Sequence, residues 1–191
     1  MGYDLRLRKP DILGSSLILA AMMMLLLPLK WLIAAVFAAG FHELCHWGMI
    51  CLCKGRVTNF DIGTKGAVMQ VDGLAVQEEL LCALAGPVGG LCLLLFAKWI
   101  PRTAFCALVQ SIYNLLPLFP LDGGRALKCM LELFLSEDAA EKICNAVAVC
   151  VKVFISVISL CFSFVLRAGI LPLIMAAMLC LRTNYRKTLA N

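Results

Sequence analysis

The chain contains two histidines, which lie four residues apart in the sequence H-E-L-C-H at residues 42–46. On a helix, this spacing places both imidazoles on one face, one turn apart, where they can bind the same metal ion. Glu43 lies beside them and can accept a proton from water that the metal activates. The pattern therefore predicts a zinc site with His42 and His46 as ligands and Glu43 as catalytic base.

A catalytic zinc usually has three protein ligands, and the sequence has no third histidine. The candidate lies in N-L-L-P-L-F-P-L-D-G-G-R, residues 114–125. Its two prolines end a helix because each removes a donor and clashes with the preceding turn, and the glycine pair permits a sharp change of direction. We predict that Asp122, at this break, is the third ligand. The alternative is that Asp122 only caps the helix that follows.

Two other polar side chains lie close to these motifs in the sequence. Asn114 precedes the first proline by three residues, and it either braces the broken helix or binds the backbone of a substrate. Cys45 lies between the two histidines, but adjacent residues on a helix do not converge on one point. We therefore expect Cys45 to serve in packing.

The composition is that of an integral membrane protein. Of the 191 residues 62% are hydrophobic and 15% are charged, and the mean hydropathy is +0.93. A soluble fold of this size leaves about 30% of its chain surface in water and could not hide so much apolar surface. These values exclude a water-soluble enzyme, and the hydrophobicity also excludes a disordered chain. Most of the 11 cysteines lie in apolar runs, which favours reduced thiols over a disulfide framework.

The elements that must position the site are hydrophobic segments, and we predict an all-α, polytopic, single domain over residues 1–191. The expected spans are 12–29, 31–53, 80–100, 103–135 with a break at 117–123, 143–166 and 169–181. Between the second and third spans, alternating residues around a glycine-rich turn predict a short β-hairpin at 57–71. A loop without regular structure at the membrane surface is the alternative for this segment.

Six spans place both termini on the same side of the membrane. Of the 17 lysines and arginines, twelve fall on that side, four fall on the other, and Lys152 lies within a span. Because positive charge gathers on the cytoplasmic side, we predict a multi-pass protein of the cell membrane with cytoplasmic termini. The net charge of +5 is explained by this topology, and we expect no nucleic-acid partner.

Ionisable groups inside a span are costly, so each is a candidate for function. The alternative to a metal site is a buried histidine pair bonded to carbonyl groups, with Glu43 as its ion-pair partner. Three costly groups together are hard to justify by packing, which favours the metal.

The two motifs together resemble those of the site-2 protease family of intramembrane zinc metalloproteases. H-E-x-x-H in the second span and N-x-x-P-x-x-P-L-D-G-G in a later span carry the resemblance, which extends over about residues 12–185. The sequence A-G-P at 85–87 is similar to a recurrent element of the family. The six-span plan and the second motif are most similar to the branch of stage IV sporulation protein FB. Members of that branch usually carry a nucleotide-sensing (CBS) domain, whereas this chain ends at Asn191 without one.

The resemblance implies a metalloendopeptidase that cleaves in or near membrane segments of its substrates. By this resemblance one zinc ion is bound by His42, His46 and Asp122, Glu43 is the catalytic base, and Asn114 assists substrate binding. The implied partners are a membrane-associated protein substrate, the lipid bilayer and regulatory membrane proteins. Regulated intramembrane proteolysis is the implied process, and a sporulation sigma-factor precursor is a candidate substrate.

Two other functions remain open at this point. A membrane protease of the prenyl-protein type usually takes a downstream glutamate as third ligand, and Glu132 and Glu141 are available for this. A metal-binding scaffold or a transporter would not need Glu43 as a base. A transporter usually shows polar groups in several spans or inverted repeats, and the sequence shows neither. Iron or cobalt could replace zinc in the same ligand set.

Overall fold

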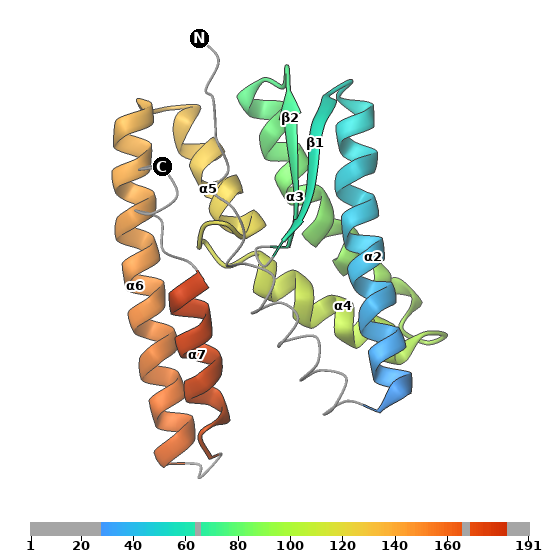
Figure 1. Ribbon diagram of the computed structural model, residues 1–191, viewed down its shortest axis with the longest axis vertical. Coiled ribbons are helices and arrows are strands. Elements are labelled where there is room, and N and C mark those ends of the chain that lie inside the picture. Colours follow the sequence, from blue (N-terminus) through green and yellow to red (C-terminus); the bar gives the residue numbers. More distant parts are fainter. Residues whose placement is uncertain (1–27, 64–65, 166–168, 183–191) are drawn as a thin grey trace.

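A computed structural model describes residues 28–63, 66–165 and 169–182. Within these ranges most of the chain is helical (Figure 1). In chain order the elements are α2 (Leu29–Leu52), β1 (Arg56–Gly63), β2 (Gly66–Asp72), α3 (Val76–Cys92), a 3-10 turn (Leu93–Phe96), α4 (Pro101–Asn114), α5 (Asp122–Glu132), α6 (Glu137–Phe164) and α7 (Leu171–Arg182).

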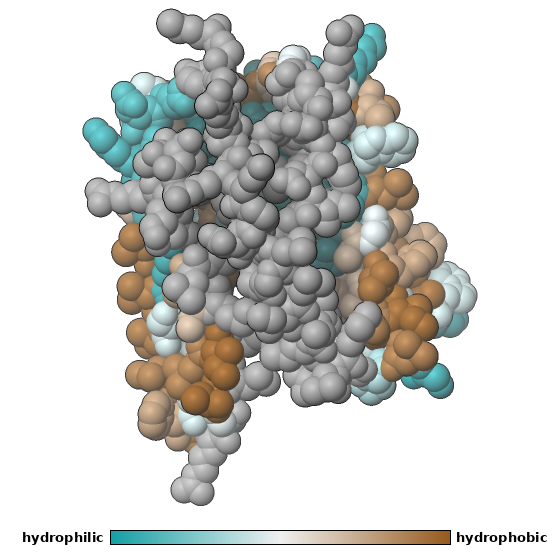
Figure 2. Space-filling model, in the orientation of Figure 1, coloured by the Kyte–Doolittle hydropathy of each residue, from teal (hydrophilic) through white to brown (hydrophobic). Residues whose placement is uncertain are grey.

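Three of these helical segments are long and apolar enough to cross a membrane: Leu29–Leu52, Val76–Phe96 and Glu137–Phe164. They overlap the predicted spans 31–53, 80–100 and 143–166. The predicted span 12–29 lies almost entirely outside the described residues, and the predicted span 169–181 overlaps the shorter helix α7. Hydrophobic side chains follow the outer edges of α6 and α2 (Figure 2). The exposed apolar residues there include Phe37 and Phe154, as expected of surfaces that face lipid.

The predicted span 103–135 consists of two helices, α4 and α5, with residues 115–121 between them. The helix α4 ends at Asn114, three residues before the expected break. Leu115 still has helical backbone angles, and Leu116 is the position at which the following proline disfavours them. The next helix begins at Asp122, where we expected the break to continue to residue 123. The peptide bond between Phe119 and Pro120 is cis.

Two antiparallel strands, β1 and β2, connect α2 to α3. Their register pairs Val57 with Val71 and Phe60 with Met69, and a bulge lies between Val57 and Asn59. The helix α2 ends at Leu52, and Lys54, two residues later, has a φ of 57°, in the left-handed region. A residue in this conformation commonly ends a helix. The two strands overlap the segment 57–71, for which the sequence predicted a hairpin, and extend one residue beyond it at each end.

The helices form two groups joined through α5 (Figure 1). Helices α2, α3 and α4 pack against one another, and α5 packs against α3; α6 packs against α5, and α7 packs against α6. Ala38, Leu93 and Ala107 form the buried core of the first group. A second core joins Leu118 and Leu121, between α4 and α5, to Ala148 of α6 and Leu179 of α7. Residues 115–121 between α4 and α5, the broken segment, are therefore packed against the second group, α6 and α7.

Candidate metal centre

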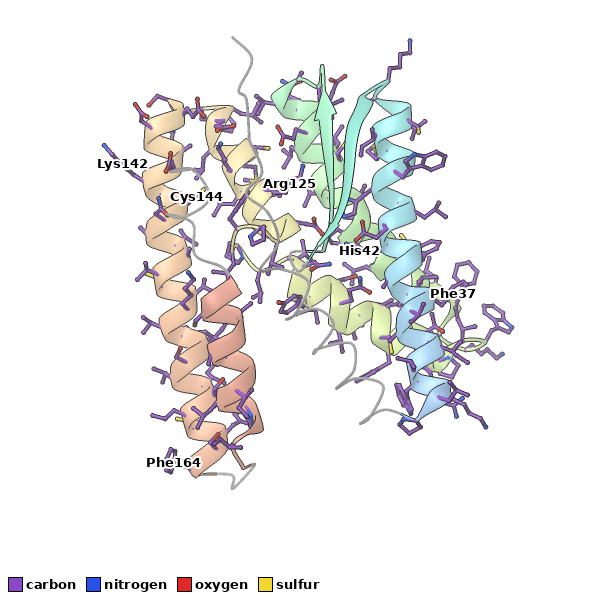
Figure 3. All side chains as sticks on the ribbon, viewed as in Figure 1. Phe37, His42, Arg125, Lys142, Cys144 and Phe164 are labelled. Atoms are coloured by element: carbon purple, nitrogen blue, oxygen red, sulfur yellow. The ribbon has the colours of Figure 1, made fainter. Side chains whose placement is uncertain are left out.

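The helix α2 turns one narrow face toward the other helices. Its buried residues recur every four positions: Ala34, Ala38, His42, His46 and Ile50. This period keeps them on one side of the helix. His42 is 2% exposed and His46 is 9% exposed. Figure 3 shows His42 on the inner side of α2 and Phe37 on its outer side.

The broken segment brings Asp122 to this face of α2. Its Oδ2 atom lies 3.0 Å from Nε2 of His42 and 3.2 Å from Nε2 of His46. The glycine pair makes this path of the chain possible. A Cβ atom at Gly123 would collide with the backbone of Leu115 and Leu116, and one at Gly124 would lie 2.5 Å from the backbone nitrogen of Phe119. Asp122 is the first residue of α5, and its carboxylate faces the two imidazoles.

The three side chains fit a shared metal ion better than a hydrogen-bond network. The Nε2 atoms of His42 and His46 are 3.1 Å apart, so three donor atoms lie 3.0 to 3.2 Å from one another. Ligands at about 2.0–2.2 Å from a tetrahedral zinc are separated by about 3.3 Å. The Nε2 atom of His42 also lies 3.0 Å from Nδ2 of Asn114. One ring nitrogen has a single proton or lone pair and cannot satisfy three such neighbours.

The carbonyl of Cys82 in α3 fixes the orientation of His46. Nδ1 of His46 donates to this oxygen at 2.7 Å, which leaves Nε2 free to face Asp122. Metal-binding histidines commonly use their second nitrogen in this way. Nδ1 of His42 is buried and has no hydrogen-bond partner among the described residues. The two rings meet edge to face, with centroids 4.7 Å apart.

Glu43 lies next to the ligands but outside the buried face of α2. Its side chain is half-buried, and it directly follows His42 in the helix. A carboxylate in this position is adjacent to the donor atoms without being one of them. A group that transfers a proton beside a metal must lie within hydrogen-bond reach of the activated water.

The structure brings together His42, His46, Asp122 and Asn114, all of which were candidates from the sequence. Cys45 points elsewhere, since a Cβ atom at Gly89 of α3 would meet its sulfur. Glu132, an alternative third ligand, pairs with Lys128 at 3.3 Å. Within the part of the chain that the structure describes, the group able to hold a metal consists of His42, His46 and Asp122.

Sequence reasoning missed the carbonyl of Cys82. It belongs to the backbone, and no residue type signals such a contact. The position of Gly86 of α3, directly against both imidazoles, was also not predicted from the sequence. The available signal was A-G-P at 85–87, a conformationally unusual sequence within an apolar helix.

No protein-family model and no curated protein matches the sequence. Among solved structures, the chain is similar to the site-2 protease from Methanocaldococcus jannaschii, with a TM-score of 0.61 and 21% sequence identity. The alignment covers 93% of this chain and 92% of that chain. At this identity the likeness concerns the fold. The chain therefore has the fold of a site-2 protease over nearly its whole length.

Proposed function

We propose that this protein is an intramembrane zinc metalloprotease, which hydrolyses peptide bonds in or near the membrane segments of protein substrates. The observation that carries the proposal is the convergence of two imidazole nitrogens and one carboxylate oxygen within 3.2 Å of one another. This convergence involves α2, a helix long and apolar enough to cross a membrane. The shared fold with a site-2 protease supports the same function.

In this proposal His42, His46 and Asp122 hold one zinc ion. Bound zinc supplies Lewis-acid chemistry that activates water and polarises the scissile carbonyl. Glu43 accepts the proton of the attacking water and returns it to the leaving amine. The Cys82 carbonyl keeps His46 in the tautomer that directs Nε2 toward the centre, which is the contribution of α3 to the ligand geometry.

We assign Asn114 to substrate binding. Its Nδ2 atom lies 3.0 Å from Nε2 of His42, so the amide reaches the centre from α4. When that ring nitrogen gives its lone pair to a metal, the amide needs another acceptor. A peptide carbonyl of the substrate is a suitable one. Asn114 would then orient the substrate chain beside the scissile bond.

The strands β1 and β2 provide a surface for an unwound substrate. Among the residues that the structure describes, each of the two strands has one edge that pairs with no further strand, and such an edge can pair with an added strand. A helix hides its carbonyls in hydrogen bonds, so a substrate must become extended before cleavage. We propose that strand addition holds it in that state. If residues 57–71 are replaced by a short glycine-serine linker, we expect zinc to be retained and cleavage to be lost. Normal cleavage by that variant would refute this step.

We further propose that the process served is regulated intramembrane proteolysis. The segment 114–124 resembles the sporulation branch of the site-2 proteases, so the membrane-associated precursor of a sporulation sigma factor is the first substrate to test. The distribution of lysine and arginine supports cytoplasmic termini for a multi-pass chain in the cell membrane.

The test compares the wild-type protein with the Glu43→Gln variant in detergent. Both are incubated with a panel of single-span substrates that includes sigma-factor precursors, and zinc is counted in both by mass spectrometry. We expect cleavage by the wild type alone, with about one zinc ion per chain in both proteins. Equal cleavage by the variant would exclude Glu43 as the base. Zinc in both proteins without cleavage of any substrate would favour a metal-binding scaffold.

A further inference from the structure

We propose that Gly86 is a positioning residue of the metal centre. The absence of a side chain at this point of α3 leaves the space in which the imidazoles of His42 and His46 converge. This inference rests on the proposed metal site. It assigns a role to a residue that touches the ligands without being one.

The space at Gly86 is already filled by the two rings. A Cβ atom built on Gly86 would lie 2.7 Å from Nε2 of His42, 2.7 Å from Cδ2 of His46 and closer still to Nε2 of His46. Real Cβ atoms essentially never approach other heavy atoms within 3.0 Å. Two of the three contacts are with the nitrogens that face Asp122. Even a methyl group at this position therefore displaces metal-binding atoms.

Contacts on other sides restrict the movement of both rings. The helix α3 holds His46 through the Cys82 carbonyl, one turn before Gly86. His42 is almost fully buried, and Nδ2 of Asn114 lies against its Nε2 atom. A ring rotation that avoided the methyl group would break one of these contacts or increase the distance to Asp122. The helix α3 therefore orients the His46 ring through the Cys82 carbonyl, and its Gly86 leaves room for both rings.

The next residue, Pro87, acts on the same turn of α3. It lies inside the helix, where proline cannot donate to the carbonyl four residues earlier and its ring presses against that carbonyl. The affected carbonyl belongs to Ala83, adjacent to the Cys82 carbonyl that accepts from His46. Gly86 and Pro87 thus adapt one turn of a membrane helix to the shape of the centre.

Gly90, one turn further along α3, provides a matched control. A Cβ atom there would collide with the hydroxyl of Ser111 in α4, but its next contacts are 3.5 Å to the carbonyl of Ala107 and 3.7 Å to Cβ of Ser111. Replacing Ser111 by alanine removes the collision. The Ser111 hydroxyl is buried and has no hydrogen-bond partner among the described residues. The double variant Gly90→Ala/Ser111→Ala therefore adds a methyl group to α3 without disturbing a ligand.

The experiment uses the full chain in detergent and four proteins: wild type, Gly86→Ala, Gly90→Ala/Ser111→Ala, and Gly48→Ala, whose added Cβ would meet nothing within 4 Å. Zinc affinity is measured by competition with a chelator, and the Co²⁺-loaded proteins are compared by their visible absorption. We expect Gly86→Ala to lose zinc affinity by about tenfold to a hundredfold, as for other changes beside metal ligands, with an altered cobalt spectrum. The other two variants should match the wild type. Wild-type affinity and spectrum in Gly86→Ala would overturn the proposal.

A second measurement does not depend on the metal. The drop in the unfolding temperature caused by Gly86→Ala is determined in the metal-free wild-type and His46→Ala backgrounds. Removal of the His46 ring eliminates two of the three close contacts, so we expect the drop to be at least halved. An equal drop in both backgrounds would overturn the steric argument. A wild-type chain that binds no zinc would refute the proposed function, while this comparison would still decide the role of Gly86.

Discussion

The segment Val76–Phe96, which consists of α3 and the 3-10 turn after it, and the helix α6 are both long and apolar enough to cross a membrane, but they are packed very differently. In the most apolar stretch of the segment Val76–Phe96, 39% of the residues are buried inside the protein, against 6% in α6. The buried positions of α3 are small: Cys82, Ala83, Gly86, Pro87 and Gly90. Small residues allow membrane helices to approach closely. The most apolar part of α6 instead presents exposed side chains such as Val153 and Phe154.

This difference indicates which part of the structure requires exact packing between helices. The centre depends on distances near 3 Å between α2 and α5, and the rings can be held only if α3 comes close. The apolar side chains of α6 are mostly exposed and suited to contact with lipid. Many different apolar side chains are tolerated in such a contact. We therefore expect substitutions in the first region to affect the metal and those on the outer face of α6 to have little effect.

The largest expected effect is that of Asp122→Ala. This change removes the carboxylate oxygen that lies within 3.2 Å of both imidazole nitrogens. We expect zinc affinity to fall by more than about a hundredfold, beyond the range known for residues that only support a ligand, and cleavage to disappear. Zinc titration is the measurement. The control Glu132→Ala, which loses a pairing with Lys128, should bind zinc normally. Zinc loss in Glu132→Ala and not in Asp122→Ala would favour the prenyl-protein type of site.

The second largest expected effect concerns the core through which the broken segment packs against α6 and α7. Leu118 is fully buried and belongs to the core that links the broken segment to Ala148 and Leu179. Leu118→Ala should lower the free energy of unfolding by about 2–5 kcal/mol, because truncation leaves a cavity. The matched variant is Phe154→Ala on the exposed side of α6, which is 64% exposed. Unfolding in mixed micelles should show a much smaller change for this variant. Equal losses would mean that the outer face of α6 is packed as tightly as this core.

The smallest effect concerns the ion pair between Arg125 of α5 and Glu79 of α3. Its atoms are 3.7 Å apart, and both side chains are more than a third exposed. Such pairs contribute at most about 1 kcal/mol and often less. We expect Arg125→Gln to leave the unfolding free energy nearly unchanged and zinc affinity at the wild-type value. A loss of zinc in this variant would show that Arg125 orients α5 at the centre.

Several parts of this site could be predicted from residue types and spacing. A spacing of four residues, close to the 3.6 residues of one turn, places His42 and His46 on one face of any helix. The prolines and glycines of residues 117–124 require a break wherever they lie in the fold. The spacing of residues in the sequence does not predict which distant segments contact one another in the fold. The sequence contains no sign that the Cys82 carbonyl faces His46, because that contact depends on the packing of α3 against α2. The role proposed for Gly86 was hidden for the same reason.

The helix boundaries show the same limit on a smaller scale. The sequence predicted one span over 103–135 with a break at 117–123, whereas α4 ends at Asn114 and α5 begins at Asp122. Proline identifies a break, but its extent depends on the burial of Leu118 and Leu121 against α6 and α7. The bulge between Val57 and Asn59 is likewise a property of the paired strands.

The most direct test of the central claim is X-ray absorption at the zinc edge of the purified wild-type protein. The claim predicts about one zinc ion per chain, with two imidazole nitrogens and carboxylate or water oxygens at about 2.0–2.2 Å and no sulfur. The chain has 11 cysteines, so a sulfur site is a real competitor. Sulfur scattering near 2.3 Å, or the absence of zinc, would contradict the account.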